Sequence, residues 1–244
     1  MVSSAASFFE LQALSFADGR VYAEDLAAIY GFNAALHPLW TYELDDDPSL
    51  FSAPGDGSLY VNDEDDTGNG SFPQCMEKVS GATGHQTARN CGPNDSIPPT
   101  AAGSTVVGSN TAKLFAFRAS DFGVRWTRKL AVIQNSATTS FGGRVVAGGE
   151  SGLVAFLELA TGQQVCQRTL AGRSFTFVGP LRATFDPGSG GAYLFDSAHD
   201  ALVKVTPWCT EAWHYGTGAT LAEVAATSAT VVGAAGTRVF ALRP

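Results

Sequence analysis

The sequence has few basic residues and no long apolar run, and these two shortages exclude several classes of function. It contains 15 Lys and Arg against 23 Asp and Glu, with a formal net charge of −8 and no basic cluster. Nucleic-acid binding requires clustered Lys and Arg that neutralise phosphates, so we expect no nucleic-acid partner. No apolar run reaches the ~20 residues of a membrane-spanning helix, and the first ten residues lack the pattern of a secretory signal.

Cysteine and histidine are also scarce, and their spacing excludes the common catalytic and metal motifs. The four cysteines, at 75, 91, 166 and 209, form no CxxC pair, so a zinc or redox site is not indicated. An even number permits two disulfides without requiring them, and the compartment stays open. The four histidines form no HExxH motif, and no G-x-S-x-G occurs, which excludes a metalloprotease and the serine-hydrolase elbow.

What the sequence does contain is a repeat of about 40 residues, written twice in succession over residues 105–126 and 144–166. Leu114 and Val154 hold the same place in the two copies, and so do Trp126 and Cys166. Both copies consist of short apolar runs separated by Gly-rich turns. A repeat of this length and composition is typical of a β-propeller blade.

The repeat extends over most of the chain and predicts a single all-β domain, residues 1–244. We count six units, centred at Ile29, Leu59, Leu114, Val154, Val203 and Val239. The fold class is therefore a β-propeller of about six four-stranded antiparallel blades. The last unit ends without its Trp-bearing strand, and residues 7–12 are the candidate strand that completes it.

The second unit is expected to carry an insertion, because Leu59 and Leu114 are 55 residues apart, roughly 15 more than one blade needs. Residues 62–103 are polar and rich in Gly, Pro, Asn and Asp, and we interpret them as an inserted loop. A disulfide between Cys75 and Cys91 would stabilise this segment. The loop is also the first candidate for contact with a partner.

The start of that segment partly follows a calcium-binding loop. Asp63, Asp65 and Thr67 alternate as oxygen ligands do in such loops, but Gln74 stands where the bidentate Glu is required. We therefore favour a solvated acidic turn, with calcium as the alternative.

The segment from Gly152 to Cys166 resembles the pyrroloquinoline-quinone (PQQ) repeat of quinoprotein-alcohol-dehydrogenase-like propellers, Gly-x-Val-Tyr-Ala-Leu-Asp-x-x-Thr-Gly-x-x-x-Trp. Here Glu158 stands in the Asp position and Cys166 in the Trp position. In that family the Trp stacks on the neighbouring blade, so the resemblance implies a structural docking role for Trp40, Trp126, Cys166 and Trp213. Members of the family are often periplasmic or extracellular, although the localisation of this chain stays open.

The resemblance implies two classes of function. PQQ-dependent dehydrogenases of the family use about eight blades, and several carry an adjacent Cys-Cys pair, which this chain lacks. We therefore expect a non-catalytic scaffold without a cofactor, which binds a protein or a small ligand on one face of the propeller. The alternatives are a quinoprotein-type oxidoreductase that uses PQQ and calcium, and a fragment of a larger eight-bladed propeller.

Overall fold

The computed structural model describes residues 13–25, 27–44, 51–64, 74–91, 99–110, 113–130, 138–175 and 183–243. All regular structure in these ranges is β-strand, and the strands form six antiparallel sheets, which we call blades 1 to 6 in chain order. This confirms the predicted fold class, a six-bladed β-propeller. The chain divides into two compact units, Met1–Pro99 and Thr100–Pro244.

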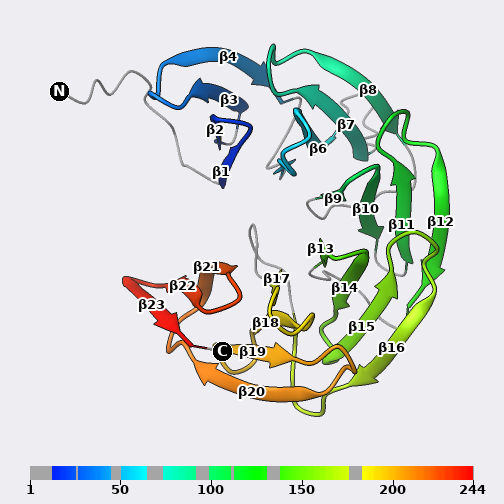
Figure 1. The fold of residues 1–244 in the computed structure, drawn as a ribbon, viewed down its shortest axis with the longest axis vertical. Helices are drawn as coiled ribbons and strands as arrows, with labels where there is room; N and C mark the ends of the chain where they lie inside the picture. The colour runs from blue at the N-terminus through cyan, green and yellow to red at the C-terminus, as the bar shows by residue number, and fades with distance from the viewer. Residues whose placement is uncertain are drawn as a thin grey trace. The chain divides into compact units, whose positions relative to one another are not determined.

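The first unit contains blades 1 and 2, each with four strands that lie in chain order across the sheet (Figure 1). Blade 1 consists of β1 (Ala13–Ala17), β2 (Arg20–Glu24), β3 (Ala28–Asn33) and β4 (Pro38–Glu43). Blade 2 consists of β5 (Phe51–Ser52), β6 (Ser58–Glu64), β7 (Gln74–Ser80) and β8 (Gln86–Cys91).

The second unit contains blades 3 to 6 and has the same strand order within each sheet. Blade 3 consists of β9 (Thr100–Ala102), β10 (Thr105–Asn110), β11 (Lys113–Arg118) and β12 (Val124–Lys129). Blade 4 consists of β13 (Thr138–Phe141), β14 (Arg144–Gly148), β15 (Leu153–Glu158) and β16 (Gln164–Thr169). Blade 5 consists of β17 (Ala183–Phe185), β18 (Ala192–Asp196), β19 (Ala201–Val205) and β20 (Glu211–Gly216). Blade 6 consists, in the described residues, of β21 (Leu221–Ala226), β22 (Val231–Ala235) and β23 (Arg238–Leu242).

Tight turns with left-handed backbone conformation connect the strands of a blade. Asp18 and Gly19 join β1 to β2 with φ values of 52° and 70°, and Gly142 and Gly143 join β13 to β14 with 58° and 78°. Two residues with positive φ are the requirement of a type I′ hairpin turn, whose twist matches that of the strands. The Asp-Gly pair after Ala17 is therefore a local cause of the first hairpin.

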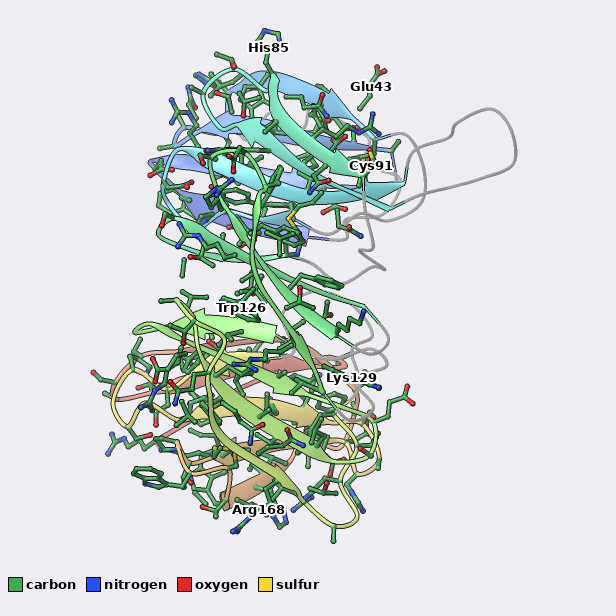
Figure 2. The ribbon with its side chains drawn as sticks, turned by 90° about the vertical axis from the view of Figure 1, so that its right-hand side faces the viewer. Glu43, His85, Cys91, Trp126, Lys129 and Arg168 are labelled. Atoms are coloured by element: carbon green, nitrogen blue, oxygen red, sulfur yellow. A yellow bond between two sulfur atoms is a disulfide. The ribbon has the colours of Figure 1, made fainter. Side chains whose placement is uncertain are left out.

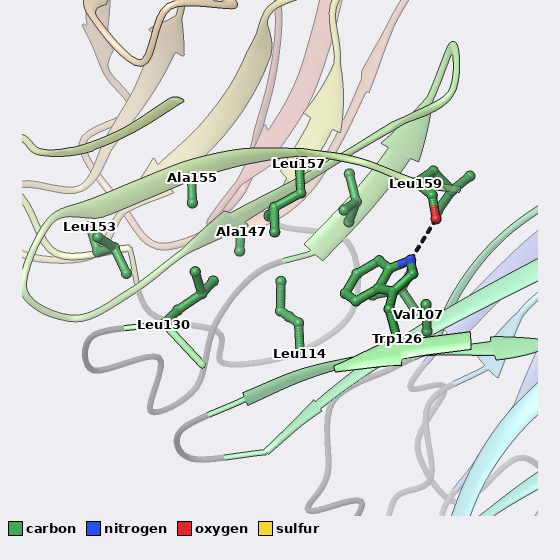
Figure 3. Packing of buried hydrophobic residues seen from close by; sticks show 11 residues of the cluster. Val107, Leu114, Trp126, Leu130, Ala147, Leu153, Ala155, Leu157 and Leu159 are labelled. Carbon is green, nitrogen blue, oxygen red and sulfur yellow. Dashed lines mark hydrogen bonds between the residues drawn. The ribbon is translucent and has the colours of Figure 1, made fainter. Parts of the chain in front are cut away.

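The core lies between successive blades. In the second unit, β15 buries both of its faces. Leu153, Ala155 and Leu157 pack against blade 3 (Figure 3). Val154 and Phe156 pack against blade 5. A third cluster joins blades 5 and 6, and a fourth joins blades 1 and 2 in the first unit. Near-continuous apolar runs such as Leu153–Leu157 result from this burial on both faces.

The expected polar insertion at residues 62–103 is not what the structure shows in the described part of that range. Strands β7 and β8 lie there, and β7 pairs with β6 and β8 along its length. Leu59 is on the second strand of its blade, whereas Leu114 is on the third strand of blade 3. The residue that corresponds to Leu114 is Met76, and the distance between them in sequence is 38 residues, an ordinary repeat.

Strand β7 has a polar sequence, so the hydrophobicity pattern does not predict it. Glu77 is buried in the middle of the strand, but its carboxylate has partners: Gln86 donates to it at 2.7 Å, Arg89 lies at 2.9 Å, and the Tyr42 hydroxyl donates a hydrogen bond. A buried charge is tolerated when it is paired in this way. The candidate closing strand, residues 7–12, lies outside the described residues.

Candidate functional site

The strongest residue-level pattern is a position on the fourth strand of blades 1 to 5, which we call the docking position. Its residue is paired with the third strand immediately before a bulge, opposite Gly31, Ala116, Phe156 and Lys204 in blades 1, 3, 4 and 5. The docking residues are Trp40, Trp126, Cys166 and Trp213, the four residues that the sequence repeat singles out. In blade 2 the same position holds Ala88, opposite Lys78, which the sequence analysis missed because alanine leaves no aromatic signature.

In two blades the docking residue is a tryptophan that lies over a glycine of the next blade. The indole N–H of Trp126 donates to the Leu159 carbonyl at 2.8 Å (Figure 3), and a Cβ at Gly162 would come within 2.6 Å of the ring. Trp40 donates in the same way to the Gly81 carbonyl at 3.1 Å and lies over Gly84. Because Gly162 has a φ of 65°, glycine satisfies both the turn and the close approach of the ring.

Blade 4 replaces this contact with a covalent bond. Cys166, at the docking position, forms a disulfide with Cys209 in the turn between β19 and β20 of blade 5. Cys209 has a φ of 59° and corresponds to Gly162 in its turn. The second disulfide, between Cys75 and Cys91, connects β7 and β8 within blade 2 and leaves Cys91 exposed (Figure 2). The described residues contain no free cysteine.

Trp213 of blade 5 is half-buried and packs against the cluster that blades 5 and 6 share. Its ring centroid lies 5.8 Å from that of Tyr193 on the same blade. It therefore contributes to the blade 5–blade 6 interface through ring packing.

The candidate calcium ligands are described only in part. Asp63 is buried near the end of β6, where it is paired with Cys75 in the sheet, whereas Asp65 and Thr67 lie outside the described residues. Within the described ranges, no three His, Cys, Asp or Glu side chains form a group that could hold a metal ion. No helix that could span a membrane occurs in that part of the chain.

A buried acidic side chain lies near Asp63. Glu24, at the end of β2, is fully buried, and neither of its carboxylate oxygens has a hydrogen-bond partner among the described residues. Burial, together with the negative charges of Asp25 and Asp63, raises the pKa of Glu24 to about 9. Glu24 is therefore protonated at neutral pH. Nothing in the Val-Tyr-Ala-Glu sequence distinguishes it from an ordinary strand-end glutamate.

The most extensive polar cluster joins blades 4 and 5. Arg173, in the segment after β16, donates to Asp196 at 2.9 Å and to both oxygens of Glu211 at 3.0 and 2.7 Å. His199 lies 2.7 Å from Asp196, and His214 lies 2.8 Å from Glu211. Burial alone would raise the pKa of Asp196, but hydrogen bonds from the Ser174 backbone and from Arg173 outweigh it and lower the pKa. The residues come from distant parts of the sequence, so no local motif predicts the cluster.

Apolar side chains are exposed on the sheet face of blade 1 that points away from blade 2. Leu14, Phe16 and Leu39 lie on this face with exposed fractions of 55%, 68% and 47%. The opposite face of the same sheet carries Tyr22 and Ile29 and packs against blade 2. Blade 6 likewise exposes Val232 and Val239 on the face opposite to its contact with blade 5.

Comparisons with known proteins support the fold and do not indicate a function. No protein-family model matches the sequence, and no curated protein does. Among solved structures, BamB from Moraxella catarrhalis is similar with a TM-score of 0.63 and 11% identity, over 93% of this chain and 67% of that one. The computationally designed protein Ika8 is similar with a TM-score of 0.70 and 12% identity, over 96% of this chain and 71% of that one. At these identities the likeness shows the fold alone.

Proposed function

We propose that this chain is a non-catalytic propeller of the PQQ-repeat type that serves as a scaffold for protein binding. The observation that carries the proposal is the set of exposed apolar side chains on blade 1, with Leu14 and Phe16 on β1 and Leu39 on β4 of the same sheet. Contiguous exposed apolar side chains are typical of protein–protein interaction sites. This apolar surface is better suited to bind another protein than to bind a polar small molecule.

The polar clusters support a non-catalytic role because their charged groups pair with one another within and between blades. Arg173 connects blade 4 to blade 5 through Asp196 and Glu211, and Glu77 binds Tyr42 of blade 1 and Arg89 of blade 2. These groups are structural ion pairs, which perturb pKa values without catalysis. The PQQ-repeat assignment is supported by the docking positions, because Trp40 and Trp126 each lie over a glycine of the next blade.

The proposal is tested by differential scanning calorimetry of the whole chain, alone, with Ca²⁺, and with Ca²⁺ plus PQQ. A ligand that binds the native state, at a hundred times its dissociation constant, stabilises it by about 2.7 kcal/mol. We expect the melting temperature to be the same in all three samples. An increase that requires both additions would contradict the proposal and support the quinoprotein dehydrogenase, and an increase with Ca²⁺ alone would identify a metal site.

A further inference from the structure

The last strands of blades 3 and 4 carry positive charges and no negative ones. Strand β12 contains Arg125, Arg128 and Lys129, and β16 contains Arg168 (Figure 2). All four residues are exposed. Blades 3 and 4, residues 100–169, contain seven basic and three acidic residues, whereas the rest of the chain contains eight and twenty. The positive charge of this acidic chain is therefore concentrated on two neighbouring blades of the second unit.

None of these four cations forms an ion pair with another described residue. Arg125 donates to the Ser104 hydroxyl at 2.9 Å, and Arg128 donates to the Gly162 carbonyl at 2.6 Å, so both have neutral partners. Lys129 and Arg168 have no side-chain partner in that part of the chain. The four charges are therefore available to a ligand.

Carboxylates of the same two blades do not compensate these charges. Asp121 is paired with Arg118 at 2.9 Å, and Glu158 is paired with Arg144 at 3.5 Å. In addition, Lys129 lies directly opposite Lys113 on β11, where two like charges destabilise a sheet. A carboxylate bound between these two ammonium groups would remove their repulsion.

We propose that β12 and β16 form a binding surface for an acidic segment of a partner protein. This surface is separate from the exposed apolar side chains of blade 1. The inference rests on the proposed function only in that the chain is a scaffold for protein binding.

The open edges of the two strands favour a peptide as the ligand. Within the described ranges, β12 and β16 each pair with a single strand, so one edge of each can bond to the main chain of an extended segment. Val124, at the start of β12 and 58% exposed, adds an apolar contact. The last strands of blades 1, 2 and 5 have similar edges, but no unpaired Lys or Arg lies on them, since Arg89 is bound to Glu77. Charge therefore distinguishes β12 and β16 from the other edges.

The charge of the whole chain disfavours a nucleic acid at this surface. Twenty acidic residues outside blades 3 and 4 repel an extended polyanion, which reaches well beyond two strands. A short acidic segment contacts only the basic strands, and salt screens the repulsion from more distant carboxylates.

The test is fluorescence anisotropy of a fluorescein-labelled oligoglutamate peptide titrated with the whole chain. We expect binding that is weaker at about 0.15 M than at about 0.01 M salt, because the contact is between exposed charges. The double variant Lys129→Glu with Arg168→Glu should bind about tenfold more weakly. Arg238→Glu with Arg243→Glu, which changes two exposed cations of blade 6, is the control with the same net charge and should bind as the wild type. Thermal melts check that both double variants fold.

Hydrogen exchange of the wild-type chain gives a measurement that needs no variant. Addition of the oligoglutamate peptide should slow amide exchange in β12 and β16, because an extended peptide bonds to their open edges. Protection confined to other blades would contradict the inference.

Three results of the binding experiment would overturn the inference. Absence of binding by the wild type at low salt would show that the charges only protect open strand edges from association. Equal weakening in the two double variants would show that net charge alone decides the affinity. Tighter binding of a labelled single-stranded oligothymidylate would make the partner a nucleic acid. The calorimetric test with Ca²⁺ and PQQ decides the non-catalytic role independently of these results.

Discussion

Cys166 and Cys209 form a disulfide between two adjacent blades at the position where, one blade earlier, an indole ring lies over a glycine. Cys166 replaces the docking tryptophan and Cys209 replaces the glycine of the turn. The contact between blades 4 and 5 is therefore covalent, whereas that between blades 3 and 4 depends on Trp126.

Removal of the two disulfides should have unequal effects. Cys166 and Cys209 are 43 residues apart, and Cys75 and Cys91 are 16 apart, so loop-closure entropy predicts losses of about 4 and about 3 kcal/mol in the free energy of unfolding. Paired serine substitutions at each disulfide, followed by urea denaturation, measure the two losses. A larger loss for the Cys75–Cys91 pair would show that chain entropy is not the main contribution.

Trp126→Phe keeps an aromatic ring at the docking position but removes the hydrogen bond and part of the ring that lies over Gly162. Trp126→Phe eliminates the indole N–H and leaves the buried Leu159 carbonyl without that donor. We expect a loss of about 1–2 kcal/mol in the free energy of unfolding. Trp208→Phe is the control, because Trp208 is 73% exposed and its loss should leave stability unchanged. Equal effects of the two substitutions would exclude a specific role for the docking hydrogen bond.

Gly162 should be more sensitive to substitution than other glycines with positive φ. In Gly162→Ala the new Cβ meets the Trp126 ring as well as an unfavourable backbone conformation. Gly172→Ala is the matched control, since Gly172 has a φ of 78° and an added methyl group there would have no neighbour within 4 Å. We expect Gly172→Ala to cost about 1 kcal/mol and Gly162→Ala clearly more, measured by thermal or urea denaturation. Similar losses would mean that the ring moves aside freely.

The Arg173 cluster should make stability depend on acid pH. The pKa values of Asp196 and Glu211 are lowered in the folded protein by their partners, so their contribution is present above the unfolded-state values near 4 and is lost as pH falls through the lower folded values. Arg173→Ala should cost about 2 kcal/mol at pH 7 and less at pH 3. Arg118→Ala, which breaks an exposed pair with Asp121, should have little effect at either pH. Urea denaturation at both pH values compares the two variants.

Glu24 should make stability decrease as pH rises from about 4.5 to about 9, a dependence of opposite sign to that of the Arg173 cluster. Its folded pKa of about 9 lies above the unfolded value, so the folded state retains a proton that the unfolded state has lost. The stability contribution is complete below about pH 4.5 and decreases by up to about 1.4 kcal/mol per pH unit as pH rises toward 9. Glu24→Gln should abolish this decrease, whereas Glu43→Gln, at an exposed position, should preserve it. Identical pH profiles for both variants would contradict the assignment.

The sequence by itself determined the fold class and the number of blades. Burial on both faces leaves near-continuous apolar runs such as Leu153–Leu157, and hairpins require local signals such as Asp18-Gly19, so both can be read along the chain. The docking positions of Trp40 and Trp126 can also be read from the sequence, because a large aromatic residue recurs at a fixed place in the repeat.

Only the tertiary structure decided which strand Leu59 belongs to and how the polar residues are used. Strand β7 was hidden because Glu77 sits in a buried strand, where partners from other strands compensate its charge. The Cys166–Cys209 bond and the Arg173 cluster join segments of different blades, and no local pattern specifies which distant residues meet. The sequence has the same limit for the apolar faces of blades 1 and 6. Alternation along a strand shows that a face is apolar, but only packing shows whether another sheet covers it.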